Sequence, residues 1–577
     1  MKKKLLPALI VTGLIILVVI IMGITALINK YTPTKKTEDL KEYFNISSDD
    51  EVALIVNNEL SDYKAKIIDK KIYVDYKFVH DSLNSRFYWD ANENVLLYTT
   101  ASDIISAAAD SNSYSVTKQT NDFGYPIVKA TSDSALIALD YVKQYSNITF
   151  KSYDDPARIV ITSKWNEIDS ATVSKPTQVR VKGGIKSPIL KEVKKDDKIT
   201  ILDSGDKWDK VATEDGVIGY IKRKALSESK KTKLTNPDYE EETFTHIKKD
   251  KDICLAWNQV TSQSANSKVP QVISSTKGIN VMSPTWFYLN DNNGNLADIA
   301  SKDYVSYCHS QGIEVWGLFS NLENTDVDAA YVLTHTSTRT TLINQIMSAA
   351  FNYELDGVNI DFENITEAAY GDSYIEFIRE LSIKCHNNGI SLSVDVTVPA
   401  SFNKFFNRSD MAKFADYIVI MGYDEHYKGS DAGSVSSIPW VTEGVESTLK
   451  EVPADQIILG MPFYTRIWEL TPKEDDDAVT DTEDQSKYTV ASQVYSMDAA
   501  AAQLATNNAT AALDEESGQN YAEWSASNKL YKVWLEDSTS LEKRLKLVDD
   551  NKLAGAAFWK LGFENSSVWD TVIKYLD

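Results

Sequence analysis

The stretch Leu355-Asp356-Gly357-Val358-Asn359-Ile360-Asp361-Phe362-Glu363-Asn364 decides how the C-terminal half of the chain is interpreted. As a β-strand, it places Val358, Ile360 and Phe362 on one face and Asn359, Asp361 and Glu363 on the other. A row of polar groups cannot face a hydrocarbon core without hydrogen bonds that offset its burial, but it can line the inside of a barrel near the mouth. Glu363 ends the row, where the C-terminal face of a barrel carries its chemistry.

The two carboxylates of this row have a chemical consequence. Asp361 and Glu363 lie two residues apart on one strand face, so they repel each other and at least one should hold its proton more tightly. A carboxylic acid of this kind can donate a proton near neutral pH. The alternative is an ordinary buried strand with a polar end.

The run resembles the signature strand of the family 18 glycoside hydrolases, the chitinase-like enzymes, which reads Asp-Gly-x-Asp-x-Asp-x-Glu. The resemblance implies that Glu363 is the general acid/base and that Asp361 orients the substrate N-acetyl group. Asp356 and Gly357 match the opening of the motif. Asn359 departs from the motif, because the family usually has Asp at this position. The departure changes how protons can be shared along the row, but it leaves Glu363, the implied general acid, in place.

From about Thr245 onward, strand-like apolar runs alternate with helical ones, which favours a parallel α/β sheet. Eight runs are expected to be strands, the number that a closed (β/α)8 TIM barrel needs. They are Ile253–Trp257, Val281–Trp286, Glu314–Phe319, Gly357–Glu363, Ser391–Thr397, Tyr417–Tyr423, Ile457–Phe463 and Gly555–Trp559. The catalytic domain is expected over 245–577, and the resemblance covers essentially all of 250–577.

Later strand ends extend the resemblance. Strand six ends in Tyr423 and Asp424, and strand eight ends at Trp559. The resemblance implies that Tyr423 hydrogen-bonds the N-acetyl group, that Asp424 helps to hold the same sugar and that Trp559 floors the pocket. Tyr464 and Arg466, after strand seven, would lie near the cleft, and Asn359 counts among the substrate-binding positions. A tryptophan at a strand end is often only core.

The segment between strands seven and eight is far longer than one crossover helix. An α+β insertion is expected at about 469–533, at the place where the family's inserted subdomain walls one side of the cleft. Within it, the acidic run 474–484 predicts a solvated loop rather than a calcium site, since its carboxylates lack ligand spacing. The run 497–512 predicts a helix, and 519–534 predicts a hairpin.

Four short motifs resemble the spore-cortex and cell-wall N-acetylglucosaminidases within the family. They are Trp257-Asn258-Gln259-Val260, Ser283-Pro284-Thr285-Trp286-Phe287, Tyr423-Asp424-Glu425-His426 and Val533-Trp534-x-Glu536-Asp537. The implied substrate is peptidoglycan, or another N-acetylglucosamine polymer such as chitin. The implied reaction is substrate-assisted hydrolysis that retains the anomeric configuration. The rivals are a non-hydrolytic glycan-binding protein, which would usually lack Glu363, and an envelope scaffold.

The N-terminus predicts a membrane anchor. Three lysines precede an apolar run over 5–28, which is long enough to span a bilayer. Its length, and the lack of a clear small-x-small cleavage site, favour an uncleaved single-pass anchor over a signal peptide. The lysines keep the N-terminus cytoplasmic, so the bulk of the chain should lie outside, on the cell-wall side. Residues 1–30 form the tip and anchor, and 31–48 a linker.

Two further domains are expected before the barrel. Residues 49–165 contain two halves that each read strand, helix, strand, turn, strand, and they resemble the stalk domain named after the N-terminus of copper amine oxidases. No copper-ligand set accompanies this resemblance. Residues 175–228 contain short strands separated by glycine turns and resemble a bacterial SH3-like β-barrel, either a wall-binding module or a spacer. A charged linker follows over 229–244.

Composition bounds the remaining possibilities. The net charge of −23 argues against nucleic acid as a partner, because phosphates need basic surfaces. Three cysteines and six histidines show no metal-ligand spacing, so no metal and no cofactor is expected. The cysteines Cys254, Cys308 and Cys385 are expected to be small buried hydrophobes.

Overall fold

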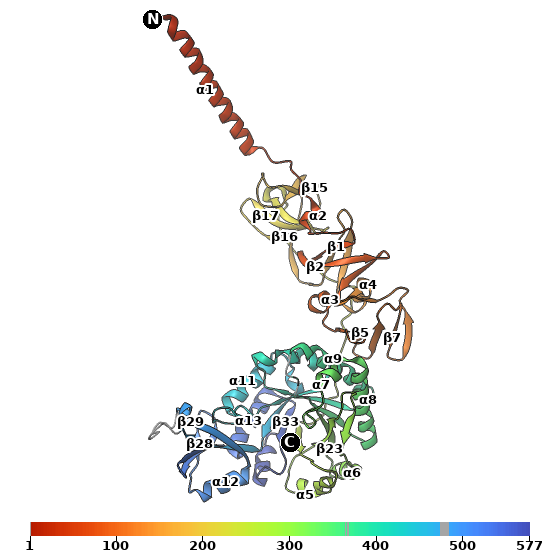
Figure 1. Ribbon diagram of the computed structural model, residues 1–577, viewed down its shortest axis with the longest axis vertical. Helices are drawn as coiled ribbons and strands as arrows, with labels where there is room; N and C mark the ends of the chain where they lie inside the picture. The colour runs from red at the N-terminus through yellow and green to blue at the C-terminus, as the bar shows by residue number, and fades with distance from the viewer. Residues whose placement is uncertain (1, 364, 366–367, 474–483, 577) are drawn as a thin grey trace. The chain divides into compact units, whose positions relative to one another are not determined.

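The structure is a computed structural model that describes residues 2–363, 365, 368–473 and 484–576 (Figure 1). The chain divides into two compact units. The first comprises Met1–Trp89, Ala107–Tyr114 and Asp122–Glu241, and the second comprises Asp90–Ser106, Ser115–Asn121 and Glu242–Asp577.

The second unit is built on a closed parallel barrel. Its eight strands are β20 (Ile253–Asn258), β21 (Val281–Leu289), β23 (Glu314–Ser320), β24 (Gly357–Asp361), β25 (Ser391–Thr397), β26 (Tyr417–Met421), β27 (Ile457–Pro462) and β33 (Gly555–Trp559). They follow the order β20-β33-β27-β26-β25-β24-β23-β21, and β20 also pairs with β21, which closes the barrel. This confirms the prediction of a (β/α)8 barrel. A short strand, β22 (Leu296–Asp298), pairs antiparallel with the end of β21.

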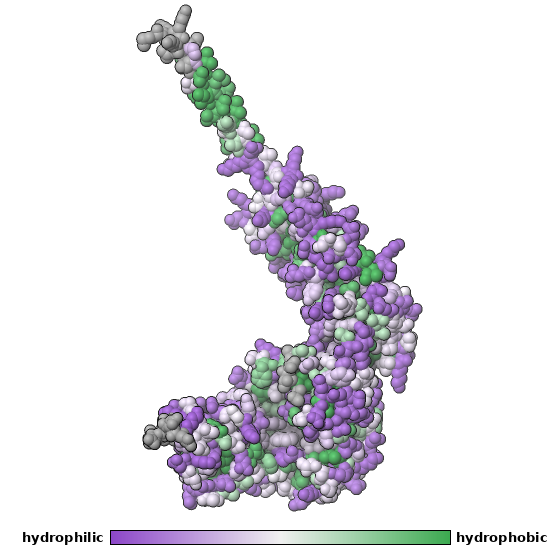
Figure 2. Space-filling model, viewed as in Figure 1, coloured by the Kyte–Doolittle hydropathy of each residue, from purple (hydrophilic) through white to green (hydrophobic). Residues whose placement is uncertain are grey.

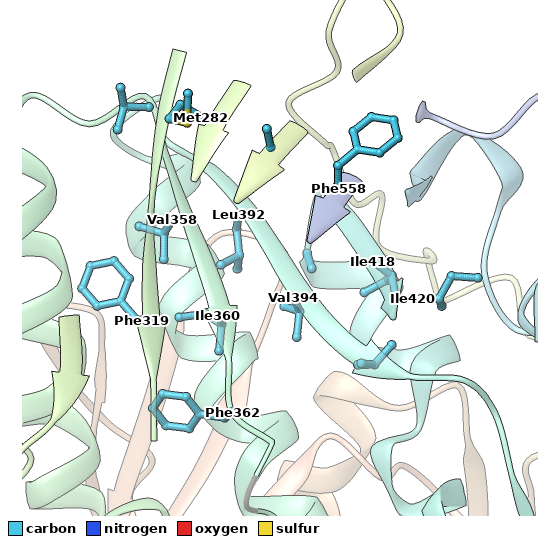
Figure 3. Packing of buried hydrophobic residues seen from close by; sticks show 14 of the residues in the cluster. Met282, Phe319, Val358, Ile360, Phe362, Leu392, Val394, Ile418, Ile420 and Phe558 are labelled. Carbon is cyan, nitrogen blue, oxygen red and sulfur yellow. The ribbon is translucent and has the colours of Figure 1, made fainter. Parts of the chain in front are cut away.

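Helices cover the outside of the barrel strands (Figure 1). They are α5 (Val269–Ile273), α6 (Lys302–Ser310), α7 (Ala329–Thr334), α8 (Thr336–Tyr353), α9 (Gly371–His386), α10 (Arg408–Phe414), α11 (Ile438–Thr448), α13 (Ser538–Asn551) and α14 (Trp569–Val572). The largest apolar core lies between strands and helices, and Figure 3 shows Val358, Ile360 and Phe362 spaced along one strand beside Leu392 and Val394 of its neighbour. Because side chains alternate, the residues between these positions face the barrel interior.

The interior of the barrel holds a separate apolar layer. It includes Leu255, Trp257, Trp316, Leu318 and Tyr417, and it fills the barrel interior up to the level of Asn359, whose side chain accepts a hydrogen bond from Trp257 Nε1. This filled interior leaves chemistry only at the mouth, where the strands end.

Between β27 and the barrel helix α13, the described residues of the insertion form a five-stranded sheet and the α-helix α12. Its elements are β28 (Tyr464–Pro472), β29 (Tyr488–Ser496), α12 (Met497–Thr506), β30 (Ala512–Asp514), β31 (Gln519–Ala526) and β32 (Lys529–Leu535), in the sheet order β29-β28-β32-β31-β30. The hairpin of β31 and β32 is present as expected, whereas the helix expected over 497–512 ends at Thr506 and β30 begins at Ala512. The insertion is wider than 469–533, because β28 starts directly after β27. The acidic run expected to be a solvated loop lies outside the described residues, apart from Asp484.

The first unit begins with the apolar helix α1 (Lys2–Tyr31), whose middle forms a continuous apolar surface in Figure 2. Within it, Leu9–Tyr31 has a mean hydropathy of 2.9 and is exposed along its length. By length and composition it is able to cross a membrane, as is a signal sequence.

A seven-stranded antiparallel sheet occupies the region of the expected SH3-like module. Its strands are β13 (Glu167–Thr172), β14 (Thr177–Arg180), β15 (Ile189–Val193), β16 (Lys198–Asp203), β17 (Trp208–Thr213), β18 (Ile218–Lys222) and β19 (Lys230–Lys233), in the order β15-β14-β18-β17-β16-β13-β19. The sheet therefore extends beyond 175–228. The expected linker over 229–244 contains β19, whose backbone pairs with β13.

The expected linker over 31–48 is also ordered against this sheet. Thr37 forms a bridge with Ile189, and a short helix, α2 (Leu40–Tyr43), follows. Phe44 is fully buried in the same core as Val179. An apolar side chain in a shared core ties this segment to the sheet, so it is not a free connection.

The expected stalk region contains two further sheets. The first is ordered β11-β12-β1-β2-β3-β10-β9, and the second β4-β5-β6-β7-β8. The bounds are β1 (Glu51–Val56), β2 (Glu59–Ile68), β3 (Lys71–Asp75), β4 (Phe87–Asp90), β5 (Val95–Thr99), β6 (Ile104–Ala108), β7 (Ser113–Val116), β8 (Gln119–Asp122), β9 (Val128–Ala130), β10 (Ala135–Ala138), β11 (Thr149–Tyr153) and β12 (Arg158–Thr162). The helices α3 (Tyr76–Ser82) and α4 (Leu139–Tyr145) occupy equivalent places in the two halves, β3-α3-β4-β5 and β10-α4-β11-β12.

One part of this region belongs with the barrel, which changes the expected boundary of 49–165. Asp90 accepts hydrogen bonds from the backbone N–H and the hydroxyl of Thr336, at the start of α8. Thr99 donates to the buried carboxylate of Glu376 on α9. These long-range polar contacts join residues 90–106 to the helices of the second unit.

The three cysteines are buried free thiols, as expected. Burial raises the pKa of both Cys254 and Cys308 to about 12, and it raises the pKa of Cys385 as well.

Candidate active site

The polar row of β24 points into the barrel and leads to its mouth. Asn359 is fully buried and Asp361 is 9% exposed, whereas Glu363, two residues beyond, is open to solvent. Val358, Ile360 and Phe362 alternate with these polar residues and pack against the helices outside the barrel. The row thus runs from the barrel interior to the open cleft, as the sequence predicts.

Asn359 is the centre of a fully satisfied hydrogen-bond network. Its side-chain oxygen accepts from Trp257 Nε1 at 2.9 Å and from Ser283 Oγ at 3.0 Å. Its side-chain nitrogen donates to Ser393 Oγ at 3.0 Å and to Asp395 Oδ1 at 2.7 Å. Two donors on one side and a carboxylate on the other fix the direction of the amide.

Asp395 is a site residue that the sequence analysis did not single out. It lies on β25, whose register with β24 pairs Asn359 with Ser393 and Ile360 with Val394. The next inward position on each strand is therefore occupied by Asp361 and Asp395. The signal that could have found Asp395 is the alternation Ser391, Ser393, Asp395 and Thr397 along β25, which repeats the pattern of the signature strand.

The carboxyl groups of the row hold their protons unusually tightly. Burial raises the pKa of Asp361 well above its usual range, and the charges of Glu363, Asp395 and Glu323 raise it further. Desolvation also raises the pKa of Glu363, with added contributions from Asp424 and Glu323. A carboxyl that stays protonated toward neutral pH at the mouth of the barrel is suited to donate a proton.

Glu323 was also missed by the sequence analysis. It follows β23 and accepts a hydrogen bond from the Ser320 hydroxyl. Its charge acts on both Asp361 and Glu363, as described above. No motif marked it, because it lies in a loop and has no fixed spacing from the signature strand.

Tyr423 and Trp559 lie beside this row at the ends of β26 and β33. The ring of Trp257 makes edge contacts with both, at centroid distances of 6.5 Å to Tyr423 and 5.9 Å to Trp559. Burial raises the pKa of Tyr423 well above its usual value, and the charges of Asp361, Asp395 and Glu363 raise it further. Its hydroxyl therefore remains a hydrogen-bond donor.

Asp424, Tyr464 and Arg466 form one polar group at the edge of the cleft. The Tyr464 hydroxyl donates to Asp424 Oδ1 at 2.6 Å, and Arg466 lies 3.7 Å from the same atom. Asp424 adopts a left-handed backbone conformation with φ of 61°. Because β28 carries both Tyr464 and Arg466, the insertion contributes directly to this edge.

Asp356 and Gly357, the first two residues of the motif, lie at the start of β24, away from the mouth of the barrel. Asp356 Oδ2 accepts from the Val315 backbone N–H and contacts His309 Nε2, each at 2.8 Å. A Cβ on Gly357 would lie 2.5 Å from the Trp316 ring, which explains the glycine. These two motif residues hold the strand in place rather than take part in chemistry.

A pocket of about 140 Å³ opens beside Glu363. Asp395 and Met421 also line it, together with Phe402, a residue that is 77% exposed. The pocket shows that space exists next to the acid, bounded on one side by an exposed aromatic ring.

Residues 318–564 match the family model described as glycosyl hydrolases family 18. The barrel is a family 18 glycoside hydrolase domain. The match spans the polar row, the tyrosine after β26 and the tryptophan that ends β33.

Curated relatives of this family 18 domain include a glycosylase and a cortical fragment-lytic enzyme. An uncharacterized glycosylase, YvbX, of Bacillus subtilis is 24% identical over 301 residues, covering 49% of this chain and 81% of the relative. The cortical fragment-lytic enzyme of Bacillus subtilis is 25% identical over 287 residues, covering 48% of this chain and 63% of that enzyme.

Among solved structures, the spore cortex-lytic enzyme SleL of Bacillus cereus superimposes with a TM-score of 0.50 at 18% identity. The match covers 60% of this chain and 77% of SleL. At this identity the likeness concerns the fold alone. The family 18 domain makes this chain a glycoside hydrolase.

Proposed function

We propose that this family 18 enzyme is a membrane-anchored hydrolase that cleaves β-1,4 bonds next to N-acetylglucosamine in peptidoglycan, with chitin as the second choice of substrate. The observation that carries the proposal is the polar row of β24. It ends in Glu363, whose raised pKa suits a general acid, next to Asp361 and to the neutral hydroxyl of Tyr423. The cortical fragment-lytic relatives favour peptidoglycan over chitin.

The other nearby carboxylates favour substrate assistance over a protein nucleophile. Within the described residues, Asp424 is held by Tyr464, Asp395 by Asn359 and Glu323 by Ser320. Each of these carboxylates thus has a partner within the protein, and the proposal assigns none of them as the nucleophile. Family 18 enzymes are an exception to the two-carboxylate scheme, because the substrate supplies the nucleophile.

The reaction then proceeds in two steps. Glu363 protonates the glycosidic oxygen while the acetamido oxygen of the substrate attacks the anomeric carbon from the opposite face, which breaks the bond and forms an oxazoline-like intermediate. Asp361 and Tyr423 orient the acetamide and stabilise the positive charge that develops on it. Glu363, now a carboxylate, takes a proton from water as the water attacks. Two displacements at one carbon retain its configuration.

The decisive experiment incubates the full chain, purified in detergent, with purified peptidoglycan, with chitin oligomers and with a β-1,4-glucan that lacks acetamido groups. New reducing N-acetylglucosamine ends from peptidoglycan, formed first as the β-anomer, support the proposal. Cleavage of the chitin oligomers alone would identify chitin, rather than peptidoglycan, as the substrate. Binding of either polymer without cleavage would leave a glycan-binding protein, and cleavage of the plain glucan would exclude substrate assistance.

We also propose that α1 anchors the chain and places the barrel on the cell-wall side of the membrane. The apolar stretch Leu9–Tyr31 and the lysines at the start of the chain support this orientation. Protease added to intact, wall-stripped cells should then cut within residues 234–252, which contain no helix or strand. Protection of this segment in intact cells, with cutting only after lysis, would contradict the topology.

A further inference from the structure

Four carboxyl groups gather at one wall of the barrel mouth, namely those of Asp361, Glu363, Asp395 and Glu323. Across the described part of the chain, no lysine or arginine forms an ion pair with Asp361, Glu363 or Asp395. Several buried carboxyls without a cation cannot all be ionised, because like charges in a poorly solvated site repel strongly. Protons must therefore be held within the cluster.

Within the cluster, Asp361 and Asp395 are related by the pairing of their strands. They occupy equivalent inward positions on the paired parallel strands β24 and β25, one residue beyond the pair Ile360 and Val394. Neighbouring strands lie about 4.8 Å apart, so two such side chains are within reach of each other. Both are buried, Asp361 at 9% and Asp395 at 3% exposure.

The Asn359 amide decides which of the two carries the charge. Its N–H donates to Asp395 Oδ1 at 2.7 Å, which stabilises the ionised form of Asp395. The Oδ1 atom of Asp361, in contrast, is buried without a hydrogen-bond partner among the described residues. An ionised oxygen in that state is costly, and protonation of Asp361 relieves the cost.

We propose that Asp395 is a positioning residue of the catalytic centre, which shares one proton with Asp361 and leaves that proton on Asp361 in the free enzyme. The signature motif places a second interior carboxylate at position 359, where this chain has Asn. In this chain that second carboxylate is Asp395 on β25. A neutral Asp361 offers an O–H donor beside the acetamide site instead of a second negative charge. The catalytic part of this inference rests on the hydrolase function proposed above, whereas the shared proton does not.

The other titratable groups around the pair are consistent with this assignment. They are Glu363 beyond β24, Glu323 after β23, Tyr374 on α9, and Tyr423 and Asp424 after β26. Burial raises the pKa of Tyr374 and of Tyr423 well above the usual value, so both hydroxyls stay neutral. Burial also raises the pKa of Asp395, while the Asn359 hydrogen bond lowers it.

Asp395→Asn in the full chain tests the proposal through the pH dependence of kcat/KM. Removal of a negative charge lowers the pKa values of the remaining coupled carboxyls, so the alkaline limb should move to lower pH by about one unit. Asn359→Asp adds a carboxyl to the same cluster and should move the limb to higher pH. The exchanged pair Asn359→Asp/Asp395→Asn keeps one carboxyl and one amide in contact, and its limb should return toward that of the unmodified enzyme.

Ser393→Ala is the matched control. It removes the other acceptor of the Asn359 amide without a change of charge. A role of Asp395 in packing alone predicts that Ser393→Ala and Asp395→Asn have similar profiles. The proposal predicts that only the charge changes move the limb.

A second measurement does not depend on hydrolysis. Infrared difference spectra across a pH titration should show a protonated carboxyl that persists well above the usual aspartate pKa of about 4. In the Asp395→Asn variant this band should disappear at a lower pH than in the unmodified protein, because the negative charge of Asp395 no longer holds the proton on Asp361. Unchanged infrared titration and an unchanged pH limb would overturn the shared proton. If the protein cleaves no glycan but shows this infrared titration, only the proposed function is refuted.

Discussion

Glu363→Gln should reduce kcat on peptidoglycan by about 10²–10⁴-fold, the usual contribution of general acid catalysis. Glutamine keeps nearly the same shape but has no proton to give to the leaving oxygen. Glu363 lies just beyond the end of β24 and forms no hydrogen bond with the described residues, so its substitution leaves no partner unpaired. The fold and the affinity for the polymer should therefore remain, as measured by circular dichroism and by sedimentation with insoluble peptidoglycan.

Glu323→Gln provides the matched control at the same mouth. It removes a carboxylate that acts on both Asp361 and Glu363 through charge. The variant should keep kcat within about tenfold, with a lower pKa on the alkaline limb, because one negative charge is lost. If Glu363→Gln kept even a tenth of the original rate, Glu363 would not be the acid.

Tyr423→Phe should lower kcat by about 10²–10³-fold, with a smaller change in KM, since one donor to a developing charge is typically worth that much. The Tyr423 hydroxyl is held neutral by burial and by nearby carboxyls, so it donates a hydrogen bond throughout the working pH range. Its ring contacts with Trp257 and Tyr464 are available to phenylalanine too. Steady-state kinetics on a soluble oligomer separates kcat from KM.

Tyr417→Phe is the control for this change, because it makes the same substitution on the same strand. Tyr417 begins β26, at the opposite end of the barrel, where its hydroxyl accepts from the Lys249 backbone N–H at 3.0 Å. Loss of this bond should cost stability of about 1 kcal/mol and leave kcat unchanged. Equal losses of kcat in the two variants would mean that Tyr423 acts through packing alone.

The barrel could be predicted from the sequence because its strands are local patterns. Most of the eight are apolar runs, such as Ile457–Pro462, whereas β24 and β25 alternate apolar and polar residues, and helical segments lie between the strands. The polar alternation of Asn359, Asp361 and Glu363 is also local, so it located the row and its order along the strand.

The remaining features depend on which strands pair and in what register. Asp395 becomes part of the site only because β25 lies next to β24 with Ser393 opposite Asn359. Strand β19 consists of four exposed residues, Lys-Lys-Thr-Lys, and carries no apolar signal at all. Its pairing with β13 is a backbone interaction between distant segments, which no local pattern reveals. The same holds for Asp90, whose partner Thr336 lies on a helix of the barrel.

The burial of all three cysteines gives the chain a practical property. Thiol reagents react with the thiolate, and a pKa of about 12 at Cys254 and Cys308 leaves roughly one thiol in 10⁵ ionised at pH 7. Cys385 is buried as well, and burial raises its pKa too. A single cysteine placed on an exposed loop should therefore react with a maleimide dye far faster than any native one. The protein can be labelled at one chosen position for fluorescence or spin-probe distance measurements without first replacing its own cysteines.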